Sequence, residues 1–285
     1  MISINDQRVL AYNSGGDSWS DYTKELSTRE GANPVVTLSP TQYLYFGSFF
    51  PFNNKYIDVF TANVTAASLD IEVFNGTAWV SVNEIFDYTD ASGTPFAQSG
   101  VIQFTTDKND VWSFVGDTHD NSYLTEFSNG PSIYDKYWLR ISSDISTTMT
   151  LNYIGQLFCS EQELRDAYPQ LTASAILNSW ESGKTDWLDQ RISGSEYIVS
   201  DLKRRGIIIE RSQVVENAVL NEPAIHRTAQ LIYSGLGPRN YAEEIKTAAD
   251  AYKDSMNMNK FEQDANANGQ KDRQEINIST HRATR

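Results

Sequence analysis

Hydrophobic and polar residues follow two different rhythms along the chain. Between about residue 35 and residue 158, apolar residues recur at every second position, in short runs separated by turn-forming residues. This period of two is typical of half-buried β-strands. Several such runs, rich in Val, Ile, Phe, Tyr and Trp, predict an antiparallel β-sandwich over 35–158 with a jelly-roll-like topology.

One hairpin of this sandwich is predicted by its turn residues. The alternating runs Leu69–Phe74 and Ala78–Val82 are joined by Asn75-Gly76-Thr77. An Asn-Gly pair supplies the positive φ angles that a tight hairpin needs. We therefore expect the two runs to pair as neighbouring antiparallel strands.

The rhythm changes at Ser160. Ser160 is followed three residues later by Glu163, a spacing that satisfies the free amides at the start of a helix. From there to residue 262 the apolar residues recur with a period near 3.6, which predicts an α-helical domain over 160–262. Gly206, after three basic residues, indicates one helix end, and Pro223 indicates a helix start.

The sequence thus predicts an α+β protein of four parts. An arm at 1–34, rich in turn-forming residues, is expected to reach a neighbouring subunit. The β-sandwich domain at 35–158 and the helical domain at 160–262 follow. A tail at 263–285 completes the chain. A length of 285 residues with 40% hydrophobic residues is sufficient for two domains with real cores.

The charge of the chain narrows the class of partner. The formal net charge is -14, with 7 basic and 18 acidic residues up to residue 159, against 16 and 19 after it. Such a balance argues against a protein that grips nucleic-acid phosphates, which needs a basic stripe. It favours solubility and the binding of cations. The basic residues at 203–205 are interpreted as cations at the C-terminal end of a helix, where they interact favourably with the helix dipole. Contact with DNA is the alternative.

Compartment is inferred from three features of the sequence. The single Cys159 cannot form an intramolecular disulfide, and we expect it to be a buried, inert thiol. The opening residues lack the pattern of a secretion signal. The longest apolar runs are too short to span a bilayer. We therefore expect a soluble protein made in a reducing cytoplasm, with no membrane partner.

A calcium-loop pattern lies near the end of the chain. Residues 264–275 place a side-chain oxygen at every second position before a glycine and close with a glutamate. This spacing suits the oxygen ligands of Ca²⁺, with the closing carboxylate bidentate and one ligand supplied by a backbone carbonyl. The predicted ligands of this structural Ca²⁺ site are Asp264, Asn266, Asn268, Gln270, Asp272 and Glu275.

The calcium loop resembles EF-hand and dockerin-type loops over these twelve residues. Lys271 stands where EF-hands carry an aliphatic residue, and residues 276–280 do not read as an exiting helix. A paired EF-hand sensor is therefore not expected. A dockerin needs a duplicated loop, and one copy is present, which disfavours a hydrolase appendage. The alternative to a metal site is a solvated polar turn.

Catalytic candidates are few. The three histidines, His119, His226 and His281, are not near a plausible nucleophile or metal partner in the sequence. The run 14–18, Ser-Gly-Gly-Asp-Ser, resembles a phosphate loop but lacks its lysine and its strand-to-helix setting, so we interpret it as a surface turn. The expected class is a protein without enzymatic activity.

Aromatic residues of the first half allow a second interpretation. They could form a platform on which sugars stack, although core packing is the simpler role. Alternation places Trp79 on the same face as Ser81 and opposite Val80 and Val82, so Trp79 is the best exposed candidate. The set comprises Tyr43, Tyr45, Phe46, Phe49, Phe50, Trp79, Trp112, Tyr137 and Trp138.

The helical half resembles the head-to-tail adaptor (connector) proteins of tailed bacteriophages. The resemblance rests on the opening SEQELRDAYPQL, on a central amphipathic helix from Trp187 to Leu202, and on the late runs HRTAQLIYSGLG and YAEEIKTAADAYKDSM. It covers about a third of the chain and carries no catalytic residue. The preceding sandwich departs from the small adaptors and is interpreted as an added, outward-facing domain.

This resemblance implies a structural virion protein in the neck between head and tail. Such adaptors form a ring, commonly of twelve copies, that contacts the portal and the tail or neck proteins. The ring extends the channel through which DNA passes without specific binding. The alternative function is a carbohydrate-binding or adhesin module of a tail or cell-surface protein.

Overall fold

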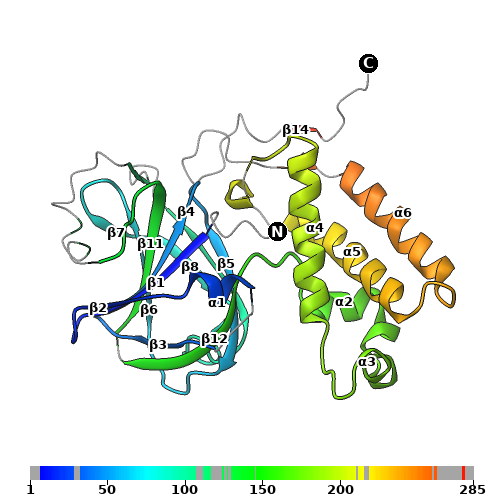
Figure 1. Cartoon of the computed structure of the whole chain (residues 1–285), viewed down its shortest axis with the longest axis horizontal. Coiled ribbons are helices and arrows are strands. Elements are labelled where there is room, and N and C mark those ends of the chain that lie inside the picture. The colour runs from blue at the N-terminus through cyan, green and yellow to red at the C-terminus, as the bar shows by residue number, and fades with distance from the viewer. Residues whose placement is uncertain are drawn as a thin grey trace. The chain divides into compact units, whose positions relative to one another are not determined.

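The chain divides into two compact units, with the boundary between them at Gly155 and Gln156 (Figure 1). The computed structural model describes residues 7–28, 33–106, 112–116, 124, 127, 130–144, 146–209, 211–214, 218–258, 260–261 and 278–279. Each unit has its own hydrophobic core. The unit boundary lies a few residues before Ser160, where the hydrophobic period of the sequence changes.

The first unit consists of two antiparallel sheets. The seven-stranded sheet has the order β2 (Ser18–Asp21), β1 (Gln7–Asn13), β4 (Gln42–Ser48), β11 (Lys136–Ser143), β6 (Leu69–Phe74) and β7 (Trp79–Ser81), with β10 (Phe114–Val115) paired to β11. The five-stranded sheet has the order β3 (Val35–Leu38), β12 (Thr147–Gly155), β5 (Asn54–Thr61), β9 (Gly100–Thr105) and β8 (Glu84–Asp87).

The core of this unit lies between the two sheets. Phe46 and Leu139 from the seven-stranded sheet join Ile57 and Leu151 from the five-stranded sheet in one buried cluster. Each fully buried aliphatic or aromatic side chain of this kind contributes about 1.5–3 kcal/mol. Consecutive strands β3 to β6 alternate between the sheets, so the chain crosses from layer to layer. The predicted antiparallel β-sandwich is confirmed.

The beginning of the chain differs from the predicted arm. Residues Gln7–Asn13 form β1, which pairs along its whole length with β4. Val9 is fully buried in the sandwich core, and Leu10 is buried on the opposite face of the sheet. The short helix α1 (Thr23–Thr28) places Leu26 in the same core. Residues 7–28 therefore belong to the sandwich, because their apolar side chains are needed on both faces of the sheet.

The predicted hairpin is present between β6 and β7, with Phe74 opposite Trp79. Its turn is longer than a two-residue Asn-Gly turn. The side-chain oxygen of Asn75 accepts bonds from the amides of Thr77 at 3.0 Å and Ala78 at 2.9 Å. Only Gly76, with φ 102°, adopts the left-handed region in this turn. Asn75 thus stabilises a four-residue loop through its side chain.

The second unit is helical. Its elements are α2 (Glu161–Ala167), the 3-10 turn η3 (Pro169–Thr172), α3 (Ser174–Trp180), α4 (Leu188–Arg204), the 3-10 turn η4 (Arg211–Gln213), α5 (Ala218–Leu236), α6 (Ala242–Met258), and the short strands β13 (Lys260–Phe261) and β14 (Ile278–Ser279). Helix α5 packs against both α4 and α6 (Figure 1). Within the described residues, no helix is both long and apolar enough to cross a membrane.

The ends of two helices follow the sequence signals. The Ser160 hydroxyl accepts a bond from the Glu163 amide, and the Glu163 carboxylate accepts one from the Ser160 amide at 2.7 Å, so the predicted capping box is present. At the end of α4, Gly206 has φ 69° and the amide of Ile207 donates to the carbonyl of Leu202 at 3.0 Å. This is a Schellman ending, which requires the left-handed glycine.

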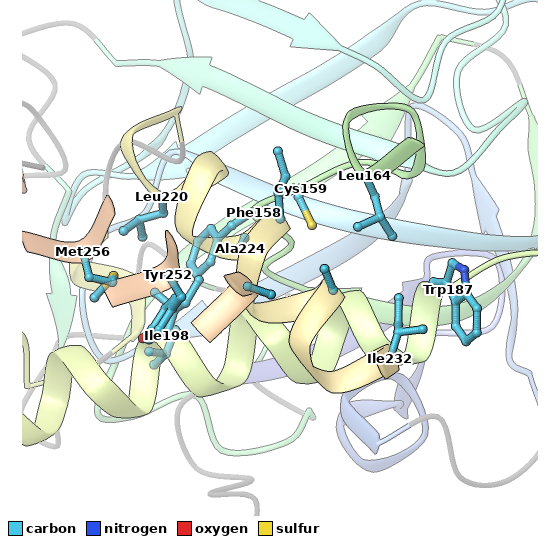
Figure 2. Packing of buried hydrophobic residues seen from close by; sticks show 14 of the residues in the cluster. Phe158, Cys159, Leu164, Trp187, Ile198, Leu220, Ala224, Ile232, Tyr252 and Met256 are labelled. Atoms are coloured by element: carbon cyan, nitrogen blue, oxygen red, sulfur yellow. The ribbon is translucent and has the colours of Figure 1, made fainter. Parts of the chain in front are cut away.

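One core holds the helical unit together. Figure 2 shows side chains from α2, α4, α5 and α6, together with Phe158, Cys159 and Trp187, in this core. The Trp187 side chain is fully buried and donates from Nε1 to the carbonyl of Leu171 at 2.8 Å. The Trp180 ring contacts it edge-on with centroids 5.3 Å apart. A buried indole with a satisfied N–H fixes the chain between α3 and α4 to the core.

The expected helix start at Pro223 is wrong. Helix α5 begins at Ala218 and continues through the proline to Leu236. Leu220 and Ala224, one turn apart on either side of Pro223, are both fully buried in the helical core. The stabilisation from burying this helix face outweighs the loss of the one backbone hydrogen bond that proline, which has no N–H, cannot donate.

Candidate functional site

The outer face of the seven-stranded sheet, which points away from the sandwich core, carries aromatic and charged residues. Strand register places Arg140 of β11 between Tyr45 of β4 and Glu72 of β6. On β7, Trp79 lies opposite Phe74. Side chains that belong to one face of neighbouring strands lie close enough to contact each other.

Arg140 is the centre of this face. Its guanidinium carbon lies 4.3 Å from the ring centroid of Tyr43 and 4.7 Å from that of Trp79, and its Nε donates to Oε2 of Glu72 at 2.6 Å. Burial disfavours the guanidinium charge, but the bond and the negative charge of Glu72 outweigh burial and raise the pKa of Arg140. The side chain is thus a permanent cation held in one orientation.

A second cluster of buried aromatic side chains lies on the same sheet face as Arg140. Tyr45, Phe74 and Trp138 are at most 1% exposed, and Phe127 packs edge-on against Tyr45. Trp138 lies across Gly47, where a Cβ atom would come within 2.8 Å of the indole. Packed aromatic side chains therefore cover part of the outer face. A sheet face that only contacts water usually carries less apolar area.

Trp79 and Tyr43 lie at the border of this cluster and are partly exposed. The predicted alternation is confirmed for Trp79, which joins the outer cluster while Val82 is buried in the sandwich core. Its ring also contacts Tyr45 and Phe74, each with centroids 5.5 Å away. Trp79 is thus a fixed ring at the edge of the cluster. We name Tyr43, Glu72, Trp79 and Arg140 the Arg140 face.

Other aromatic candidates serve packing. Phe46 and Trp112 lie in the sandwich core, and Tyr137 packs against it. Residues 14–17 of the run compared above with a phosphate loop form the turn between β1 and β2, and Ser18 begins β2. The hydroxyl of Tyr12 in β1 donates to the carboxylate of Asp17 in the turn at 3.1 Å. The interpretation as a surface turn is confirmed.

The helical unit contains a buried carboxylate, Asp201, near the end of α4. The Asp201 side chain is 2% exposed and pairs with the guanidinium groups of Arg204 and Arg205, the latter at 2.9 Å. The Tyr252 hydroxyl of α6 donates to it at 3.0 Å. Burial opposes its ionisation, but these bonds and charges outweigh burial and lower the pKa of Asp201.

This arrangement gives the basic run at 203–205 a specific role. Arg204 and Arg205 neutralise Asp201, and Asp201 connects α4 to α6 through Tyr252. Beside it, the Arg227 guanidinium lies 3.4 Å from the ring centroid of Tyr197, and burial lowers the pKa of Arg227. The cluster is a structural link between three helices.

Two remaining candidates of the helical unit are structural. The Cys159 thiol is buried, its sulfur lies 3.7 Å from the Thr228 hydroxyl, and burial raises its pKa to about 12. The predicted buried thiol is confirmed. His226 shares a 2.8 Å hydrogen bond between Nδ1 and the Tyr168 hydroxyl, and burial lowers the pKa of His226. Nδ1 therefore helps to fix α5 against the residue that follows α2.

The predicted calcium ligands, from Asp264 to Glu275, lie outside the described residues, as do His119 and His281. Strands β13 and β14 flank the calcium loop in the sequence and pair with each other, with Phe261 opposite Ile278. Elsewhere in the described ranges, no group of three or more His, Cys, Asp or Glu side chains is placed to hold a metal ion.

Comparison with known proteins gives no relative for the chain. No protein-family model, no curated protein and no solved structure matches it.

Proposed function

We propose that the protein is a structural virion protein of a tailed bacteriophage, a head-to-tail adaptor without enzymatic activity. In this proposal the helical unit forms a ring, of twelve copies, below the portal, and the sandwich faces outward. The observation that carries the proposal is a separate helical unit with its own closed core, built on the residues that resemble adaptor proteins.

Features of the helical unit support an assembly role. Helix α2 is capped at Ser160, helix α4 ends at Gly206, and Asp201 connects α4 to α6. A rigid unit loses little conformational entropy when it joins a ring. Tyr197 and Ile209 are 39% and 72% exposed, so this unit also presents apolar surface for contact with the next subunit.

Charge supports the passage of DNA through the ring. The residues after 159, which include the helices of the helical unit, carry 16 basic and 19 acidic residues and so have no excess of cations for gripping phosphates. DNA would therefore slide along the channel without specific binding. The partners in this proposal are other copies of the chain, the portal and the tail or neck proteins. The location is the neck of the virion, after synthesis in the host cytoplasm, with no membrane partner.

The calcium loop serves assembly geometry in this proposal. The antiparallel pairing of β13 with β14 brings residues 261 and 278 side by side, and these two residues flank the calcium loop in the sequence. A Ca²⁺ ion would remove the repulsion among three carboxylates brought into one loop. The ion would then fix the direction in which the tail reaches the next subunit or the portal.

The calcium proposal is tested by titration calorimetry of the assembled protein. Glu275→Gln removes the bidentate ligand and is expected to weaken calcium binding at least tenfold. Glu244→Gln, an exposed carboxylate on α6, is the matched control and should bind calcium as the unchanged protein does. Absence of calcium binding by the unchanged protein would refute the site.

The adaptor proposal is tested by electron microscopy of the full-length protein, alone and mixed with the portal of the same phage. We expect rings whose symmetry gives the copy number. A strictly monomeric state in both samples would refute the proposal. So would the absence of the protein from purified virions, measured by mass spectrometry.

A further inference from the structure

We infer that the Arg140 face is a binding site for a neutral sugar ring. This inference goes beyond the adaptor proposal, because it concerns the sandwich unit and not the assembly of the helices. It rests on the juxtaposition of two partly exposed rings, Trp79 and Tyr43, with a fixed ion pair, Arg140 and Glu72.

The side chains of the Arg140 face complement the chemistry of a sugar. One face of a pyranose ring consists of C–H groups, and its edge carries hydroxyls that both donate and accept hydrogen bonds. Aromatic rings accept the C–H face, while a few polar groups fix the orientation of a ligand in such sites. Trp79 and Tyr43 supply the rings, and Arg140 and Glu72 supply a charged donor and a charged acceptor.

The side chains of the Arg140 face are held in place before any ligand binds. The side chains of Arg140 and Glu72 are 15% and 23% exposed, so both are largely fixed while part of each still reaches solvent. Trp79 is held by Tyr45 and Phe74, which are fully buried. Groups that are already ordered lose little entropy when a ligand binds. The Arg140 face therefore has the rigidity that weakly bound sugars need.

The charge on and around the Arg140 face favours one class of sugar. Arg140 and Glu72 form one ion pair, so the face itself is close to neutral. The surrounding half of the chain is strongly acidic, with 18 acidic against 7 basic residues up to residue 159. Uronic and sialic acids would be repelled by this field, whereas neutral hexoses would not.

The experiment is binding of the full-length protein to an array of oligosaccharides that carries neutral hexose glycans beside uronic-acid and sialic-acid glycans. Affinities for the neutral glycans are then measured by calorimetry. We expect binding to neutral glycans. Trp79→Ala should weaken it at least tenfold, Trp79→Phe should weaken it less, and Glu72→Gln should weaken it several-fold.

Two exposed aromatic residues provide matched controls. Phe114 on β10 is 42% exposed and packs against Tyr137, and Phe86 is 47% exposed on β8 of the five-stranded sheet. Their replacement by alanine should leave sugar affinity unchanged. Circular dichroism confirms that each variant is folded. Glu72→Gln keeps the side-chain shape and provides a readout if Trp79→Ala does not fold.

Three outcomes would overturn the inference. The first is no binding to any glycan, which would leave the Arg140 face as packing of the sheet surface alone. The second is binding that Trp79→Phe and Glu72→Gln do not change. The third is a preference for acidic over neutral glycans, because the acidic half of the chain should repel acidic sugars.

Discussion

The two units bury aromatic residues in different ways. In the helical unit, Trp187 lies in the single core that holds the helices together. In the sandwich, Trp138 lies in a second cluster on the outer face of the seven-stranded sheet, separate from the core between the sheets. In the part of the chain that the structure describes, the buried apolar side chains of the helical unit thus form one core, while the sandwich has a second buried aromatic cluster besides its core.

This difference agrees with the two roles that we propose. A helical unit that forms a ring needs rigid helices, and the buried polar cluster around Asp201 links helices to each other. The sandwich has a core between its sheets and, separate from it, a second aromatic cluster beside Arg140, where we propose that a sugar binds. Our two proposals therefore place assembly in one unit and ligand contact in the other. The following predictions test whether the two units are energetically separate.

The largest effect is expected from removal of the two buried indoles. Trp187→Ala should lower the stability of the helical unit by about 3–5 kcal/mol, and Trp138→Ala should do the same to the sandwich. Each indole is at most 1% exposed and donates to a backbone carbonyl, Leu171 at 2.8 Å and Ile133 at 2.7 Å. Chemical denaturation followed by circular dichroism measures both transitions.

The matched pair decides whether the units are independent. Trp187→Ala should shift the helical transition alone, and Trp138→Ala the sandwich transition alone. If either substitution lowered both transitions equally, the two cores would form one cooperative unit and the separation of roles would be wrong.

A smaller effect is expected from Asp201→Asn. The substitution removes the negative charge that Arg204 and Arg205 neutralise and weakens the bond from Tyr252. Hydrogen bonds to charged groups contribute about 1.5–3 kcal/mol, so the helical unit should lose about that amount at neutral pH. Thermal unfolding with the sandwich signal as internal control measures this loss.

The pH dependence of this contribution follows from the lowered pKa of Asp201. A carboxyl group whose pKa is lower in the folded than in the unfolded state stabilises the fold above its ordinary pKa near 3.8. That stabilisation is lost as the pH falls through the folded value. The helical unit should therefore lose stability below about pH 4, and Asp201→Asn should lessen this loss. An identical pH profile for both proteins would contradict the role given to Asp201.

The smallest effect is expected at the start of α2. Ser160→Ala removes the acceptor of the capping box and should lower the stability of the helical unit by about 1 kcal/mol. Thr172→Ala is a useful control, because the Thr172 hydroxyl donates to a nearby carbonyl in an exposed turn and caps no α-helix. Equal losses for the two variants would show that the cap contributes nothing specific.

Local signals in the sequence predicted much of this fold. The hairpin between β6 and β7, the capping box at Ser160 and the glycine ending at Gly206 each depend on neighbouring residues only. Two predictions failed where distant packing decides. The turn-rich start of the chain contains β1, residues 7–13, which pairs with β4. Pro223 lies within α5 because both sides of it face one core.

The Arg140 face shows why a site is harder to predict than an element. Arg140 and Glu72 are 68 positions apart, and only the register between β6 and β11 brings them together. Trp79 was identified from alternation within one strand, but its neighbours Tyr43 and Arg140 come from other strands. A signal was present in β11, where a charged residue interrupts the run KYWLRISS on the same face as Trp138.

The most direct test of the separation of roles is the mass of each half in solution. Mass photometry and electron microscopy would be applied to the full chain of 32.1 kDa, to residues 1–155 and to residues 156–285, because Phe158 and Cys159 belong to the helical core. We predict that the full chain and residues 156–285 form rings of the same copy number, while residues 1–155 stay monomeric and folded. Rings formed by residues 1–155, with residues 156–285 monomeric, would contradict the separation of roles.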